Sequence, residues 1–140
     1  MNPYLEKITS LLAAAYISAE VVSDDYWPDA SGDSVVVFRV DSLSLRFSRD
    51  RSHEFLEIAC ALAPERYIWF GDIEVAMGWR SLERVLAGTE SQPIEEVVNR
   101  LRQHLGDLKK MFFKNLETFE RTAIMRTMRK GPLHINSPKH

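Results

Sequence analysis

The chain has 140 residues, of which 45% are apolar, so it is long enough to bury the core of one globular domain without disulfides or metals. Its single cysteine excludes an internal disulfide and a cysteine-rich zinc site, and it favours a reducing cytoplasmic compartment. The net charge of -2 conceals an asymmetry, because residues 1–34 carry six acidic residues against one basic residue, whereas residues 100–140 carry three against ten. The two ends of the chain therefore face different partners, or each other.

An amphipathic helix is predicted at the N-terminus. Asn2 can cap its first turn, and Pro3 can occupy the first helical position, where a missing N–H costs nothing. The apolar residues that follow recur at three- and four-residue steps, which predicts a core-packed helix as far as about Ala19. The run from Ile8 to Ala19 is also similar to a signal-peptide core, but its leader contains Glu6 and lacks a basic cluster, which argues against secretion.

The segment VVSDDYWPDASGDS, residues 21–34, is predicted to be a loop, preceded at most by a short edge strand over Val21 to Ser23. Large aromatic side chains ringed by one sign of charge are typical of an interface anchor within an electrostatic steering field. The alternative is that Trp27 folds back as a lid on the sheet edge while the acids are merely solvated. The predicted partner-binding residues are Asp24, Asp25, Tyr26, Trp27, Asp29 and Asp33.

Three consecutive strands are predicted between Ser34 and Cys60. The first, Val35 to Val40, is apolar on both faces except at one arginine, and the next two alternate between apolar and polar residues as half-buried strands do. The polar connections between them are short enough for hairpins, so an antiparallel meander follows. A fourth strand is predicted over Tyr67 to Phe70. The expected fold is α+β, with an antiparallel sheet of about four strands covered by the N-terminal helix and a long C-terminal helix.

Two short helices are predicted after the sheet. Asp72 is expected to cap the first, which Gly78 ends, and Ser81 is expected to cap the second, which Gly88 ends.

The longest element is predicted to run from Pro93 to Lys130, which is about 57 Å for a straight helix at 1.5 Å per residue. A domain of this size has a radius of gyration of only ~14 Å, so the helix must bend, overhang the sheet, or bind something. A bend at Gly106 would divide it, although the uninterrupted apolar phase favours a continuous or gently kinked helix. Gly131 and the proline after it are expected to end the helix, which makes residues 1–130 one domain and residues 131–140 a disordered tail.

The apolar stripe of this helix continues beyond the reach of a small sheet. It should therefore fold back after a bend or pack against another chain, for which a homodimer through two such helices is the simplest form. The residues predicted to take part in self-association are Leu116, Phe119, Ile124 and Met128.

No catalytic or metal-binding motif is present. His53 and Glu57 would share a strand face but lie about 13 Å apart, which is too far for a hydrogen bond. Cys60 falls on an apolar face, and His104 has no ligand at metal-binding spacing. The sequence lacks the glycine-rich nucleotide-binding, serine-hydrolase and zinc-protease motifs, and no apolar run reaches the ~20 residues that span a bilayer. We therefore expect a protein that is not an enzyme and that uses no metal, cofactor or membrane contact.

A cluster of basic residues near the C-terminus has two alternative interpretations. Cations on a projecting helix could neutralise phosphates, which would make the protein a nucleic-acid-associated regulator. They could instead complement the helix dipole and pair with the acidic N-terminal third, and the pI of about 6.1 makes nucleic acid the weaker interpretation. The residues concerned are Lys109, Lys110, Lys114, Arg121, Arg126, Arg129 and Lys130.

The stretch LSLRFSRDRSHEFLEIA, within a meander over Val35 to Trp69, resembles immunity proteins of bacterial polymorphic or contact-dependent toxin systems. The motif on which the resemblance rests is a strand that ends in L-R-F-x-R-D-R, followed by a short turn and a second strand. The chain departs from it at Ser52, where the turn would be expected to hold glycine. The resemblance implies a non-catalytic inhibitor that binds one cognate toxin domain, and it carries over no functional residue. The polar residues Arg49, Asp50 and Arg51 are interpreted as hairpin residues.

Overall fold

The computed structural model describes residues 2–30, 32–87 and 93–135. Within them the chain is an α+β protein with one antiparallel sheet of five strands. Its elements are α1 (Pro3–Ala14), β1 (Glu20–Trp27), β2 (Asp33–Val40), β3 (Leu43–Asp50), β4 (His53–Cys60), β5 (Ala63–Trp69), α2 (Phe70–Ala76), α3 (Leu82–Ala87), α4 (Ile94–Met111), the 3-10 turn η1 (Phe113–Asn115) and α5 (Leu116–Ile135).

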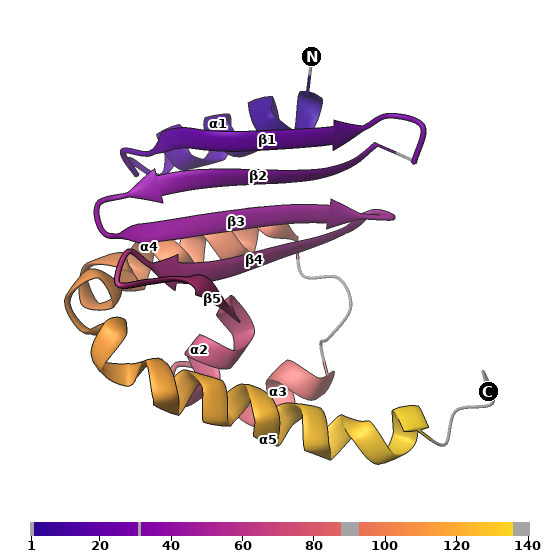
Figure 1. Cartoon of the computed structure of the whole chain (residues 1–140), viewed down its shortest axis with the longest axis vertical. Coiled ribbons are helices and arrows are strands. Elements are labelled where there is room, and N and C mark those ends of the chain that lie inside the picture. The colour runs from indigo at the N-terminus through magenta and orange to yellow at the C-terminus, as the bar shows by residue number, and fades with distance from the viewer. Residues whose placement is uncertain (1, 31, 88–92, 136–140) are drawn as a thin grey trace.

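The sheet is a meander in the order β1-β2-β3-β4-β5, as predicted, with one strand more than expected. The additional strand is β1, which occupies residues assigned to a loop by the sequence pattern. The helices α1 and α4 lie on one face of the sheet, and α5 runs past the β5 end beside α2 (Figure 1).

The core lies between the sheet and the helices α1 and α4. Alternate residues of the central strands face these helices and are buried, and the rings of Phe38 and Phe47 meet edge to face with their centroids 6.0 Å apart. Cys60 is buried in the same layer, in agreement with its predicted apolar position. The other core residues of β2, β3 and β4 are Val36, Val40, Leu43, Leu45, Leu56 and Ile58.

The start of α1 is as predicted, but its end is five residues earlier than Ala19. The Asn2 side chain accepts hydrogen bonds from the amides of Tyr4 and Leu5, and Pro3 follows the cap. The helix ends at Ala14 because Tyr16 adopts a left-handed backbone with φ of 58°. The amide of the next residue, Ile17, then bonds back to the Leu12 carbonyl at 2.9 Å, a common way of closing a helix.

The predicted long helix is broken, but not at Gly106, where α4 continues without interruption. The break is the 3-10 turn after Met111, where the side-chain Nδ2 of Asn115 donates to the Met111 carbonyl at 2.9 Å. Beyond it, α5 folds back along α2 and β5, and the rings of Phe112 and Phe119 pack with centroids 5.2 Å apart across the turn. The apolar phase is preserved through the turn, which is why periodicity alone did not reveal it.

The stop predicted at Gly131 is wrong, because α5 extends to Ile135. Residues 136–140 of the predicted tail lie outside the described residues, so their disorder stays a prediction.

The short helix α2 differs from expectation in the role of Asp72. Its cap position is Trp69, and Asp72 lies inside the helix, 1% exposed. Its carboxylate pairs with the Arg126 guanidinium of α5 through two hydrogen bonds of 2.6 and 3.0 Å. Gly78 ends this region with a left-handed φ of 78°, and Ser81 caps α3 through the amide of Arg84, both as predicted.

A second buried carboxylate, that of Glu74, joins α2 to α4. It is 1% exposed and accepts from Arg100 at 2.6 Å and from Arg80 at 3.4 Å. The basic C-terminal helices thus pair with acids in the middle of the chain rather than with the acidic N-terminal third. A further example is Lys109, which lies 2.7 Å from Asp41 in the β2–β3 turn.

Candidate functional site

The strand β1 forms one edge of the sheet and is the most exposed of its strands. It pairs with β2 on one side only, and its residues from Glu20 to Asp25 are all exposed. The opposite edge strand, β5, lies beside α5, to which it is tied by hydrogen bonds from the Arg66 guanidinium to Glu120. In Figure 1 α1 lies behind β1, and among the described strands none pairs with the outer side of β1. An accessible backbone edge of this kind is a template for pairing with another chain.

The predicted partner-binding residues are divided between the two faces of this strand. Because paired residues point to the same face, Asp25 and Trp27 share the face opposite the helices with Val35 and Asp33. Asp24 and Tyr26 point to the face on which α1 lies. Asp29 is exposed in the connection between β1 and β2. The structure therefore brings Asp25, Trp27 and Asp33 together and separates them from the rest of the predicted set.

The side chain of Trp27 is half exposed, at 50% of its full accessible area. It ends β1 directly opposite Asp33 of β2, with Asp25 two residues earlier on the same face. An indole that keeps half its surface in water is not the buried lid of the alternative interpretation. This position is suitable for an aromatic anchor flanked by carboxylates.

Asp33 also has a structural role that the sequence did not indicate. Its Oδ1 accepts a hydrogen bond of 2.9 Å from the amide of Arg51 in the β3–β4 turn. Arg51 and Ser52 both have left-handed φ values, 52° and 74°, as a tight two-residue hairpin turn requires. The glycine expected from the resemblance would adopt the Ser52 conformation without strain.

Sequence reasoning missed three exposed hydrophobic residues at the other end of β1 and in the turn before it. Tyr16 falls within the core-packed helix predicted as far as Ala19, yet it is 91% exposed at the turn before β1. Val21 and Val22 are both half exposed in β1, where the register shifts by a bulge between Val21 and Ser23. The only signal for them was the short edge strand suggested over residues 21–23.

The predicted self-association residues are also divided. Leu116 and Phe119 are fully buried within the chain and are therefore not available to a second copy. Ile124 and Met128 are exposed on α5, together with Met125. The folding back of α5 accounts for the first pair, and only the second pair remains a candidate contact.

Two of the predicted basic residues near the C-terminus are paired with acidic side chains. Lys109 and Arg126 are engaged by Asp41 and Asp72. The exposed basic residues of α4, η1 and α5 whose side chains are described are Arg102, Lys109, Lys110, Lys114, Arg121 and Arg129.

Histidine, cysteine and carboxylate side chains do not gather in groups of three or more that could hold a metal ion anywhere in residues 2–30, 32–87 and 93–135. His104 stacks on Trp79 with ring centroids 3.7 Å apart, and His53 stacks on Phe55. Among the described helices, none is both long and apolar enough to cross a membrane.

Comparisons with known proteins return no match to a family model, to a curated protein or to a solved structure.

Proposed function

We propose that this chain is a non-catalytic protein-binding module, an immunity protein that binds and neutralises one cognate bacterial toxin domain in the cytoplasm. The observation that carries the proposal is the position of Trp27, half exposed at the end of an edge strand between the carboxylates of Asp25 and Asp33. The resemblance of the β3–β4 hairpin to immunity proteins supplies the partner class.

An aromatic anchor and the charged residues around it would both contribute to binding. Burying the exposed half of an indole in a partner pocket supplies contact energy, and aromatic side chains of this kind dominate many interfaces. The acidic residues that flank Trp27, with Asp24 and Asp29 nearby, would attract a basic toxin surface and accelerate the encounter. Nucleases and other toxins that act on phosphates present such basic surfaces.

The first test identifies the partner. The tagged protein is used to capture a stoichiometric partner from its native host, and the partner gene is then expressed in a neutral host with and without this chain. The proposal requires that the partner arrest growth and that co-expression restore it. A stoichiometric partner that is harmless when expressed alone would contradict the proposal.

The second test locates the interface. We expect Trp27→Ala to weaken partner binding by about 2 kcal/mol, or roughly 30-fold, without loss of the fold, because the indole is an exposed anchor. Leu62→Ala is the matched control, since Leu62 is an exposed apolar residue in the β4–β5 turn, remote from β1. Isothermal titration calorimetry gives the affinities, and equal affinities for the two variants would show that Trp27 is not an anchor.

Reversing one acidic charge distinguishes long-range electrostatic attraction of the partner from direct contact with it. Asp29→Lys should slow association and flatten its dependence on salt, while changing dissociation less, because rim charges act mainly on the encounter rate. Glu65→Lys, at an exposed position of β5, is the control. Stopped-flow association at several salt concentrations gives both rates.

A further inference from the structure

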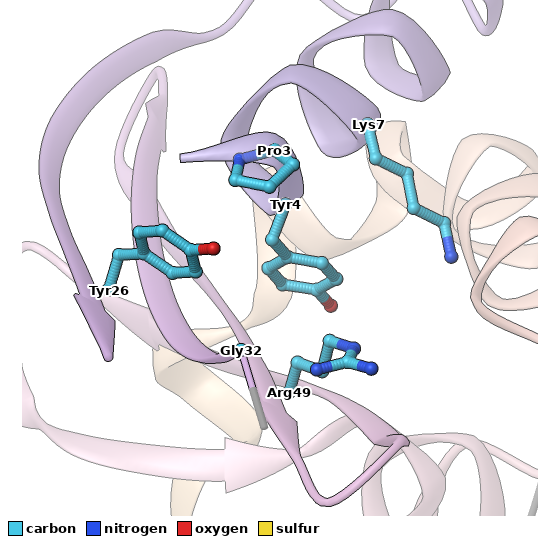
Figure 2. A pocket seen from close by; sticks show the side chains of 6 residues that line it. All are labelled: Pro3, Tyr4, Lys7, Tyr26, Gly32 and Arg49. Carbon is cyan, nitrogen blue, oxygen red and sulfur yellow. The ribbon is translucent and has the colours of Figure 1, made fainter. Parts of the chain in front are cut away.

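A pocket of about 340 Å³ lies where α1 begins and the β1–β2 and β3–β4 hairpins end. This volume is at the lower end of the range of about 300–1,000 Å³ that small-molecule sites occupy. Figure 2 shows its lining, which comes from three separate segments of the chain. The lining residues are Pro3, Tyr4, Lys7, Tyr26, Gly32 and Arg49.

The lining combines apolar rings with positively charged side chains. The rings of Pro3, Tyr4 and Tyr26 provide apolar walls, while Lys7 and Arg49 provide positive charge. The Lys7 ammonium lies 3.0 Å from the nearer carboxylate oxygen of Glu54 and balances that nearby charge. None of the lining residues is acidic, so the wall itself favours an anion.

The hydroxyl of Tyr4 is the most informative group in this pocket. Tyr4 is 4% exposed, and its buried hydroxyl has no hydrogen-bond partner of normal geometry in the protein. Burial, and then the Glu54 carboxylate, hold the pKa of Tyr4 far above its ordinary value, so the group is a protonated donor. The Glu54 carboxylate is near enough to raise this pKa, but it does not accept a hydrogen bond of normal geometry from the Tyr4 hydroxyl, so this buried donor lacks the well-formed bond that buried hydroxyls normally make.

The Tyr4 ring is oriented so that its hydroxyl points toward the guanidinium of Arg49 (Figure 2). Gly32 closes the same side with a φ of 75°, and a Cβ there would come within 3.2 Å of the Arg49 Nη1 atom. Glycine therefore allows the guanidinium to lie close to the β1–β2 turn, beside the pocket. The planar fork of an arginine matches the two oxygens of a carboxylate.

We propose that this pocket binds a small organic carboxylate. The Arg49 guanidinium pairs with the carboxylate, the Tyr4 hydroxyl donates a hydrogen bond to one of its oxygens, and the apolar body of the ligand lies against Pro3 and Tyr26. The site is independent of the proposed function, although Tyr26 belongs to the same strand as Trp27.

The test uses benzoate as the probe and benzamide as its neutral counterpart of similar shape, at constant ionic strength. We expect benzoate to shift the amide resonances of residues 4–7, 32 and 49 in a saturable way, and benzamide to leave them unchanged. N-acetylphenylalanine and its amide are compared in the same manner. Tighter binding of the free acid than of benzoate would identify a peptide C-terminus as the source of the carboxylate, and weaker binding would identify a free organic acid.

Two substitutions at the pocket and one control substitution test which residues bind benzoate. Arg49→Gln and Tyr4→Phe should each weaken benzoate binding at least tenfold, whereas Arg129→Gln on α5 should not change it. Tyr4→Phe keeps the ring and should melt no lower than the wild type, because it removes an unsatisfied hydroxyl.

Three outcomes would overturn the proposal. The first is the absence of saturable shifts with benzoate, and the second is equal shifts with benzamide or with inorganic phosphate. The third is Tyr4→Phe that binds benzoate normally and melts lower than the wild type, which would mean that the hydroxyl bonds to Glu54 in solution.

Discussion

At the scale of single residues, Arg126 joins α5 to α2 by pairing with a buried carboxylate. Its Nε lies 2.6 Å from Asp72, and its guanidinium lies 4.9 Å from the ring centroid of Trp69. The same indole covers Gly71 so closely that a Cβ there would be 2.5 Å from a ring carbon. A carboxylate 1% exposed is tolerable only because the arginine neutralises it and occupies its oxygens.

This arrangement predicts a large effect from one substitution. Arg126→Leu should lower the free energy of unfolding by about 3 kcal/mol, because it leaves the carboxylate of Asp72 buried without its guanidinium. Arg129→Leu, one turn along the same helix and exposed, should change it by no more than about 0.5 kcal/mol. Urea unfolding followed by circular dichroism gives both values.

A double variant separates loss of the pair from loss of packing. Arg126→Leu combined with Asp72→Leu should be more stable than Arg126→Leu alone, since no charge is then left unpaired in the interior. A double variant no more stable than the single one would show that the arginine acts only through its contacts.

At the scale of the elements, hydrophobic periodicity predicted the strands that have a buried face, and it missed most of the exposed edge strand. The hydrophobic pattern identified β2 as an apolar run and β3 and β4 by alternation, because one face of each strand is in the core. It missed most of β1 because Asp24 and Asp25 are unfavourable in strands, whereas an edge strand needs only backbone pairing with β2. The break before α5 was missed because Phe112, Leu116 and Phe119 are all buried and keep their phase across it.

The contact between α5 and β5 should depend on pH. Hydrogen bonding to Arg66 holds the pKa of Glu120 below its ordinary value of 4.5. A carboxylate whose pKa is lower in the folded state contributes stability above that ordinary value and loses it as the pH falls through the folded value. Glu120→Gln should therefore be slightly less stable than the wild type at pH 7, and the difference should vanish on acidification below pH 4.5.

The effect should be small, because both side chains are partly in water. Thermal unfolding at pH 7, 5 and 3 measures it, with Glu65→Gln on β5, the strand that carries Arg66, as the control. A difference between Glu120→Gln and the wild type that is as large at pH 3 as at pH 7 would rule out the ionised pair as its cause.

At the scale of the whole molecule, the sequence predicted the α+β class and the antiparallel meander, but not the surfaces. The pocket could not be predicted, because its lining comes from residues 3, 4, 7, 26, 32 and 49, which only the fold brings together. The charge asymmetry suggested that the basic end pairs with the acidic N-terminal third. The folding back of α5 instead directs Arg126 to Asp72 and leaves the acids of β1 exposed.

The folded-back helix also changes the expectation for self-association. Because Leu116 and Phe119 are covered, the exposed apolar row among the described side chains of α5 is reduced to Ile124, Met125 and Met128, too few to bury the ~1,200 Å² of a stable interface. We expect a monomer across micromolar concentrations by sedimentation velocity. A concentration-dependent species that Ile124→Glu abolishes would instead establish the homodimer.

The basic residues lead to a prediction for nucleic acids. With Lys109 and Arg126 engaged by acids, we expect no appreciable binding to generic DNA or RNA at physiological salt. Fluorescence anisotropy from low to physiological salt tests this. Micromolar affinity that falls steeply and linearly in a log–log plot against salt would favour the nucleic-acid alternative.

The meander has a consequence for the order in which the molecule assembles. Each strand pairs with its neighbour in sequence, so the sheet closes only short loops, which cost little chain entropy and form quickly. The Arg126–Asp72 pair joins residues 54 positions apart and needs a helix at the far end of the chain. During synthesis the ribosome releases the strands first, so the nascent chain should complete its acidic edge while α5 is still inside the exit tunnel.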